Sequence, residues 1–138
     1  MIRPMAEDER TFVRETCAKV RWPHEYSQER GRMWPSVLWS QWLADHGAAI
    51  DQWLEHGECL VYEERGVVLG FLVSTGHTLR CLYVKREFRG HRIGLALAAA
   101  RWPGFIELSV YRPTPSLLQW ARLHGLPWRQ DEADRRAA

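Results

Sequence analysis

The residues whose types and spacing most clearly predict a chemical function lie at positions 82–100, in the sequence LYVKREFRGHRIGLALAAA. An apolar run typical of a strand ends here in a basic turn that contains glycine, and a helical pattern begins directly after it. The first N–H groups of a helix have no partner within the helix, and the helix dipole favours negative charge at that end. The sequence therefore predicts an anion-binding cradle, centred on residues 89–95, which we call the cradle.

Other signatures of phosphate, metal or nucleophilic chemistry do not occur in the sequence. The segment RGHRIG is not followed by the Gly-Lys-Ser/Thr of a P-loop, and its glycine spacing is not that of a dinucleotide-binding motif. The sequence contains no HExxH motif, no Cys/His cluster and no GxSxG motif. Cys17, Cys59 and Cys81 lie far apart in apolar contexts and predict buried, reduced thiols. We therefore expect no metal.

The size and composition of the chain predict one soluble globular domain over residues 1–138, with 129–138 as a frayed tail. Of the 138 residues, 46% are hydrophobic and 26% are charged, which is ordinary for a globular protein of this size. No apolar run approaches the roughly 20 residues that span a bilayer. The first ten residues, MIRPMAEDER, do not resemble a signal peptide. We expect a cytoplasmic protein without membrane association.

The charge pattern bears on possible phosphate-containing partners. The net charge of +2 is too small to predict nucleic-acid binding by itself, but 17 of the 19 positive residues are arginine. Arginine binds phosphate bidentately better than lysine does, although genomic composition alone can give the same bias. The eight tryptophans suit a core, an interface or an aromatic pocket.

Periodicity and turn residues predict the elements that must position the cradle. The expected strands are residues 2–5, 59–64, 67–75, 78–84 and 105–110. The expected helices are residues 7–21, 35–45, 48–56, 94–101 and 115–124. The first helix is expected to end before Trp22-Pro23, followed by a loop over 23–33, and His46-Gly47 is expected to interrupt the second. Residues 59–84 predict an antiparallel meander, and the strand at 105–110 should return parallel to it.

This order of elements, β-α-α-β-β-β-α-β-α, resembles the GNAT superfamily of acyl-CoA-dependent N-acyltransferases over residues 2–128. GNAT proteins typically read apolar-V-x-P-x-[FY]-R-G-x-G-I-G-x-x-L around the cradle, and residues 82–97 read LYVKREFRGHRIGLAL here. The resemblance implies an α/β fold of mixed α+β type, in which helices flank a central mixed, mostly antiparallel sheet.

The resemblance also implies a site for acetyl-CoA, or another acyl-CoA, as co-substrate. The strand before the turn would offer backbone groups to the pantetheine arm, and the cradle would surround the diphosphate with N–H groups. The implied binding residues are Leu82, Tyr83, Val84, Arg89, Gly90, His91, Arg92, Ile93, Gly94, Leu95 and Thr114.

Two positions depart from the family pattern. Arg92 stands where the family usually has a glycine that lets the backbone approach the phosphates. If its side chain points outward, the cradle survives and gains a phosphate partner; if it points inward, it obstructs CoA. The last helix of the family typically reads N-x-x-A-x-x-[FL]-Y-x-x-x-G-[FY]. Counted back from Gly125, Thr114 takes the asparagine place and Trp120 the aromatic place, while Ala121 replaces a tyrosine thought to protonate the departing thiolate.

The family mechanism suggests roles for several further groups. In a ternary complex an amine attacks the thioester directly, which requires a base, an oxyanion donor and, optionally, an acid. Glu63 or Glu64, and Glu107, are the candidate bases. The backbone N–H near Val84 is the expected oxyanion donor, and Tyr111, just after the fifth strand, is the candidate replacement acid.

We therefore predict an acyl-CoA-dependent N-acyltransferase that acts on a primary amine of a small molecule, protein or nucleotide. Two alternatives stay open. The first is a non-catalytic module that binds CoA or a protein partner, which Ala121, Arg92 and the short C-terminus favour. The second is a nucleic-acid-directed modifier whose arginines and exposed tryptophans grip phosphates and bases. A short sheet with an exposed edge and many tryptophans is also compatible with a homodimer.

Overall fold

One mixed sheet organises the fold. The computed structural model describes residues 1–29 and 35–131, and within these it leaves the side chains of residues 21–42 and 45 undescribed. In the described ranges six strands follow the order β1-β2-β3-β4-β5-β6 across the sheet. They are β1 (Ile2–Pro4), β2 (Glu58–Glu64), β3 (Val67–Thr75), β4 (Thr78–Val84), β5 (Leu108–Val110) and β6 (Trp128–Gln130). Strands β1 to β4 pair antiparallel, whereas β5 and β6 are added in parallel, as the fold class predicted.

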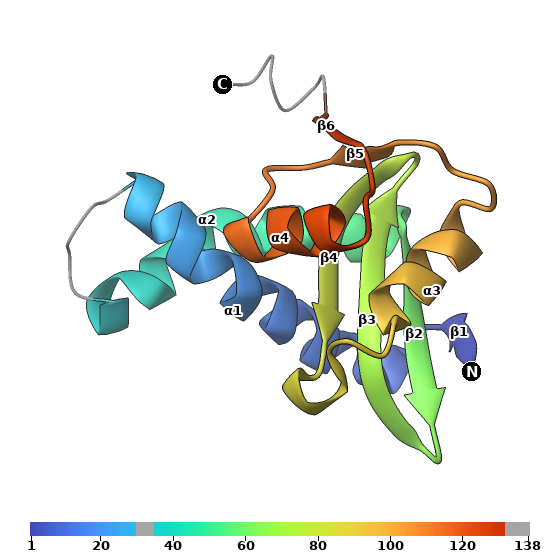
Figure 1. Ribbon diagram of the computed structural model, residues 1–138. Helices are drawn as coiled ribbons and strands as arrows, with labels where there is room; N and C mark the ends of the chain where they lie inside the picture. The colour runs from blue at the N-terminus through green and yellow to red at the C-terminus, as the bar shows by residue number, and fades with distance from the viewer. Residues whose placement is uncertain (30–34, 132–138) are drawn as a thin grey trace.

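Helices cover both faces of this sheet (Figure 1). They are α1 (Arg10–Glu29), α2 (Pro35–His56), α3 (Ile93–Arg101) and α4 (Pro115–Leu123), with short 3-10 turns η1 (Glu7–Glu9) and η2 (Arg86–Phe88). The pair α1 and α2 lies behind the sheet, and α3 and α4 lie in front of it. Among the described helices, none combines the length and apolarity needed to cross a membrane.

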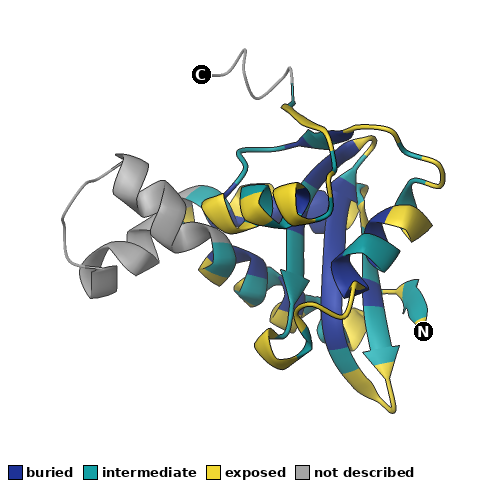
Figure 2. Ribbon diagram, in the orientation of Figure 1, coloured by how far each residue is buried: buried dark blue, intermediate teal, exposed yellow. Residues whose placement is uncertain are grey.

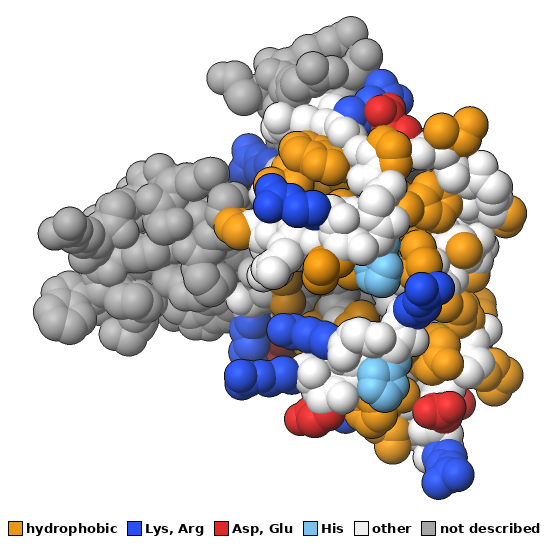
Figure 3. All heavy atoms as spheres, in the orientation of Figure 1, with side chains coloured by type: hydrophobic (Ala, Val, Ile, Leu, Met, Phe, Trp, Pro, Cys, Tyr) orange, Lys and Arg blue, Asp and Glu red, His pale blue; other side chains and the backbone are white. Residues whose placement is uncertain are grey.

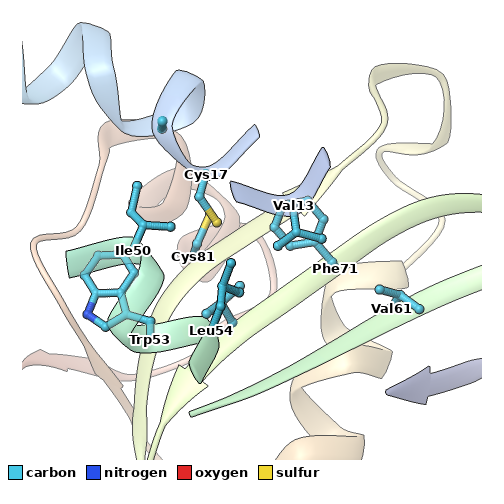
Figure 4. Close-up of a cluster of buried hydrophobic side chains, with 10 residues drawn as sticks. Val13, Cys17, Ile50, Trp53, Leu54, Val61, Phe71 and Cys81 are labelled. Carbon is cyan, nitrogen blue, oxygen red and sulfur yellow. The ribbon is translucent and has the colours of Figure 1, made fainter. Parts of the chain in front are cut away.

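The two faces carry separate hydrophobic cores. Side chains of α1 and α2 meet β2, β3 and β4 in the first core (Figure 4), which includes Val13, Cys17, Ile50, Trp53, Leu54, Val61, Phe71 and Cys81. In the second core α3 packs Ile93, Leu97 and Ala98 against Leu69, Leu72 and Leu79. Strand β3 is buried along most of its length because it contributes to both cores (Figure 2). Cys17, Cys59 and Cys81 form no disulfides; Cys17 and Cys81 are buried as predicted, whereas Cys59 is only partly buried.

Strands β2, β3 and β4 pair antiparallel in succession, which confirms the predicted meander. Arg65 and Gly66 connect β2 to β3 with φ values of +53° and +80°, which are the positive values of a type I′ hairpin turn. Gly76 and His77 connect β3 to β4. These tight turns fix the register that aligns β4 with the cradle.

The prediction that the first helix ends before Trp22-Pro23 was wrong. Helix α1 continues through Pro23 to Glu29, so residues 23–29 of the predicted loop are helical; residues 30–34 lie outside the described part of the chain. A proline disfavours the α region at the residue before it, but this is a preference, and helices do continue through proline.

The expected interruption at His46-Gly47 was also wrong, because α2 is one continuous helix. Gly47 has a packing role. A Cβ atom at Gly47 would lie only 2.7 Å from the guanidinium of Arg14 on α1. The absence of that atom lets Arg14 reach Asp51, whose Oδ1 lies 2.6 Å from Arg14 Nε. The glycine therefore permits close contact between the two helices rather than ending one of them.

The C-terminal strands differ from prediction in their bounds. Strand β5 begins at Leu108, since β4 offers partners only to Ser109 and Val110. The preceding Ile106 is 86% exposed. Strand β6 includes Arg129 and Gln130, which had been assigned to the frayed tail, because β5 provides a second parallel partner there. Residues 132–138 lie outside the described part of the chain.

Candidate functional site

Strand β4 has an open edge on the side that faces β5. Over the described residues, β5 pairs with β4 only at Thr78 and Leu79, and the Tyr111 N–H donates to the Leu79 carbonyl at 3.0 Å. Beyond that point the two strands separate, and we call the space along residues 80–84 the gap. The Lys85 N–H donates to the Leu69 carbonyl of β3 at 2.8 Å. Because antiparallel residues alternate in the direction of their hydrogen bonds, the N–H and C=O groups of Leu82 and Val84 face the gap.

The cradle lies at the open end of this gap. Strand β4 leads through η2 to Gly90, with φ of +92°, and to Arg92, with φ of +62°, before α3 begins. In the described structure, five backbone N–H groups of this turn have no protein acceptor; they belong to Gly90, Arg92, Ile93, Gly94 and Leu95. The first amide of the helix segment with an acceptor is that of Ala96, which donates to the Arg92 carbonyl at 3.0 Å. The N–H groups without protein partners that the sequence predicts at this helix start are therefore present in the turn.

Positive side chains surround these donors. Figure 3 shows Lys, Arg and His side chains over the β4–α3 turn, and the surface is hollowed between this turn and α4. Arg89, His91 and Arg92 are all exposed. Arg89 Nε donates to the Val84 carbonyl at 3.1 Å, which ties the turn to the last residue of β4.

Arg92 directly precedes the first residue of α3. Its side chain is exposed, and its backbone adopts the left-handed conformation that a glycine would adopt without strain. A non-glycine residue in that region is disfavoured by about 1–2 kcal/mol. Arg92, in place of the usual glycine, thus keeps the backbone conformation of the cradle with some local strain, and it adds a cation beside the cradle.

Helix α4 lies next to the cradle and the gap. Thr114 is its N-cap, and its nearly buried hydroxyl accepts a hydrogen bond from the Leu117 N–H at 3.3 Å. Ala121 is 3% exposed. Trp120 touches the first turn of α3, since its Nε1 would lie 3.1 Å from a Cβ atom at Gly94. The structure gives Thr114 a capping role and places Trp120 beside the predicted binding groups.

The closed end of the gap holds an aromatic and cationic cluster. Tyr111 packs edge-on against Trp53 with 5.2 Å between ring centroids. The guanidinium of Arg80 lies 4.5 Å from the centroid of Tyr111 and 5.4 Å from that of Trp53. Its Nε donates to Thr75 Oγ1 at 2.7 Å. Tyr111 therefore lies where strands β4 and β5 begin to part.

Sequence reasoning did not select Arg80 or Trp53 for this cluster. Arg80 is the one charged residue within the apolar strand TLRCLYV, and that isolated charge was a usable signal. Trp53 belongs to the first core, one of the three places that the sequence left open for the tryptophans. Its additional contact with Tyr111 depends on the tertiary arrangement of α2 and β5, which no local pattern reveals.

The structure does not bring the three carboxylate candidates to the gap, and Glu64 lies on β2 next to Glu63. Glu63 lies on β2, two strands away from the gap, where its Oε1 is 2.9 Å from the Arg3 guanidinium. The same guanidinium binds Glu9 at 2.8 Å and holds the pKa of the Glu9 carboxyl below its ordinary value. Glu107 is exposed before the start of β5, and its Oε1 lies 3.2 Å from Arg129 Nε.

Several solved acetyltransferases have a fold similar to that of this chain. A GCN5-related N-acetyltransferase from Rhodopseudomonas palustris aligns with a TM-score of 0.55 and 20% identity over 89% of this chain and 79% of its own. The aminoglycoside N-acetyltransferase AAC(6')-Iy, solved with CoA, aligns with a TM-score of 0.56 and 22% identity over 96% and 89%. PaiA N-acetyltransferase from Thermoplasma acidophilum, also solved with coenzyme A, aligns with a TM-score of 0.55 and 15% identity over 91% and 86%.

These comparisons define the fold as that of a mixed α/β acetyltransferase domain. The chain has the GNAT fold, and the resemblance seen in residues 82–97 is confirmed at the level of the fold. In sequence, no family model and no curated protein matches the chain.

Proposed function

We propose that the protein is an acyl-CoA-dependent N-acyltransferase, with acetyl-CoA as the co-substrate and a primary amine as the acceptor. One observation supports this function most strongly. The open edge of β4 leads directly into a turn with five unpaired N–H donors. A linear ligand with an anionic diphosphate at one end and an amide-bearing arm fits both features at once.

Different segments of the chain would bind different parts of the CoA molecule. The cradle would hold the diphosphate, while the N–H and C=O groups of Leu82 and Val84 would pair with the amides of the arm. With the diphosphate in the cradle, the arm runs along β4 so that the thioester lies near Tyr111 at the closed end of the gap. The N–H of Leu82 lies nearer to Tyr111 than that of Val84, and it is the better placed oxyanion donor.

The thioester, when bound, supplies an activated acyl group. The acceptor amine forms the new C–N bond and loses one proton to water, while the C–S bond breaks and the sulfur leaves as a thiolate. The thiolate takes up a proton, and water reprotonates the group that supplied it. We assign this proton to the hydroxyl of Tyr111, which lies beside the Arg80 cation at the closed end of the gap. Glu63 and Glu107 are not assigned a catalytic role, because their ion pairs hold them elsewhere.

Calorimetric titration with acetyl-CoA tests the binding step, and release of free thiol with a panel of primary amines tests the transfer. Gly90→Ala should weaken acetyl-CoA binding, because a side chain at φ of +92° strains the turn and displaces its donors. Gly66→Ala is a matched control, since Gly66 also has positive φ and open space around it but lies in a distant hairpin. Absence of binding at millimolar acetyl-CoA would refute the proposal.

A non-catalytic CoA-binding module is the second candidate, and the buried Ala121 in place of the family tyrosine favours it. The two candidates differ in one measurement. A protein that binds acetyl-CoA but releases no thiol with any amine of the panel is a binding module, whereas amine-dependent thiol release identifies the transferase.

A further inference from the structure

Trp120 of α4 packs directly on the start of α3. A Cβ atom placed on Gly94 would lie 3.1 Å from Trp120 Nε1, 3.4 Å from its Cε2 and 3.3 Å from Leu82 Cδ2. Such distances leave almost no space, so the indole, the β4 side chain and the helix backbone are in contact. The indole nitrogen thus lies beside Gly94, whose own N–H is one of the five unpaired donors of the cradle.

The Trp120 indole N–H has no acceptor among the described residues. Trp102, at the far end of α3, differs in this respect, because its Nε1 donates to the Gly76 carbonyl at 3.2 Å. Trp120 is half-buried, and its side chain packs against the second core, beside Leu82. An indole that buries its ring usually provides its N–H with an acceptor. Among the described residues that acceptor is missing, and the indole nitrogen lies next to Gly94 in the first turn of α3.

We propose that the Trp120 indole N–H donates a hydrogen bond to the diphosphate of bound CoA, as a side-chain addition to the five backbone donors. This inference rests on the proposed function. The diphosphate is the partner, rather than the pantetheine arm, because the indole nitrogen adjoins Gly94 in the first turn of α3, where the unpaired N–H groups gather. A Cβ atom at Gly94 would lie 3.1 Å from the indole nitrogen, so a side chain there would push the indole by a few tenths of an ångström.

Titrations of Trp120→Phe with three ligands test the assignment. Phenylalanine keeps an aromatic ring in the apolar packing and removes the donor. We expect affinity for CoA and for 3′-phospho-ADP, which contains the diphosphate without the arm, to fall about tenfold, as for loss of one hydrogen bond to a charged group. Affinity for pantetheine should not change. Trp102→Phe should bind all three ligands like the wild type, because the Trp102 N–H already has a protein acceptor.

A second readout separates ligand binding from a structural role. The ¹H–¹⁵N resonance of the Trp120 indole, assigned by its loss in Trp120→Phe, should shift on addition of 3′-phospho-ADP and not on addition of pantetheine. Gly94→Ala, which keeps Trp120 but displaces it, should reduce this shift and weaken 3′-phospho-ADP binding. Thermal melts of each variant verify that it is folded.

The outcomes distinguish the inference from the proposed function. If the wild type does not bind CoA, the proposed function fails and takes this inference with it. If the wild type binds CoA and folded Trp120→Phe binds CoA equally well, only the role of Trp120 is refuted. A loss confined to pantetheine also refutes it, since the donor would then serve the arm.

Discussion

Replacing Arg92 with glycine should make the protein more stable and a weaker CoA binder at the same time. Arg92 holds a left-handed backbone with φ of +62°, which is unfavourable for a residue with a Cβ by about 1–2 kcal/mol. Glycine removes that strain but adds freedom to the unfolded chain, which offsets roughly 0.4–1 kcal/mol. The net expected gain in the free energy of unfolding is about 0.5–1 kcal/mol.

The gain is large enough to measure by thermal unfolding. With an unfolding entropy of about 2.1 cal/mol/K per residue, the whole chain has about 0.3 kcal/mol/K, so Tm should rise by about 2–3 °C. Arg65→Gly is the matched control, because Arg65 is also exposed and has φ of +53°, but it lies in the β2–β3 hairpin. It should show a similar rise in Tm.

Only Arg92→Gly should affect the ligand. Removal of an exposed cation beside the diphosphate loses roughly 0.4–1 kcal/mol, which corresponds to about two- to fivefold weaker CoA binding, and it should reduce the salt dependence of that binding. Arg65→Gly should bind CoA like the wild type. A fall in Tm for Arg92→Gly would contradict the assignment of strain, and unchanged affinity and salt dependence would contradict the role of its charge.

Three further predictions concern side chains outside the cradle. Tyr111→Phe should lower the rate of thiol release about tenfold while acetyl-CoA affinity stays constant, because it removes the proposed acid and keeps the ring packing; an unchanged rate would remove Tyr111 from the mechanism. Glu63→Gln and Glu107→Gln should keep their acyl-transfer rates within about twofold, since neither carboxylate reaches the gap; a large loss in a folded variant would restore that residue as a base. The pKa of Glu9 is lowered in the folded state by Arg3, so its stabilising contribution is present above the ordinary glutamate pKa and is lost as pH falls through the folded-state value. Arg3→Ala should therefore be less stable than the wild type at pH 7 in urea titrations, with the difference shrinking at acidic pH below about 4; a difference independent of pH would show that Arg3 acts through packing alone.

The cradle could be predicted from sequence because it is built locally. Its strand, turn and helix are consecutive, and the arginine and glycine residues that shape the turn lie within a few positions of one another. The meander was predictable for the same reason, since Arg65-Gly66 and Gly76-His77 fix the hairpins. Even Arg92, a departure from the family pattern, follows the local geometry that its neighbours impose.

The closed end of the gap could not be predicted in this way. Its members come from α2, β4 and the segment after β5, so their meeting depends on the packing of the whole domain. Glu63 was misjudged for a related reason. It was a plausible base until the structure paired it with Arg3, which lies 60 positions away in the sequence.

The continuity of α2 could not be predicted from the local sequence either. Gly47 was interpreted as a break, because glycine is unfavourable in a helix interior. In the structure it lies under the side chain of Arg14 from the neighbouring helix. The contact between α1 and α2 thus favours a continuous helix at Gly47, where helix propensity alone predicts an interruption.

The parting of β4 and β5 has a consequence for the protein without its ligand. The sheet is effectively interrupted in its interior, and the amides of Leu82 and Val84 must be hydrated there. Any free strand edge is a template on which another chain can add, and proteins usually protect such edges by covering them. Here α4 lies in front of β4 and stands beside the opening (Figure 1). Helix α4, which lies next to the proposed ligand site, therefore also covers this internal strand edge. Variants that loosen α4 should aggregate more readily before they lose their fold.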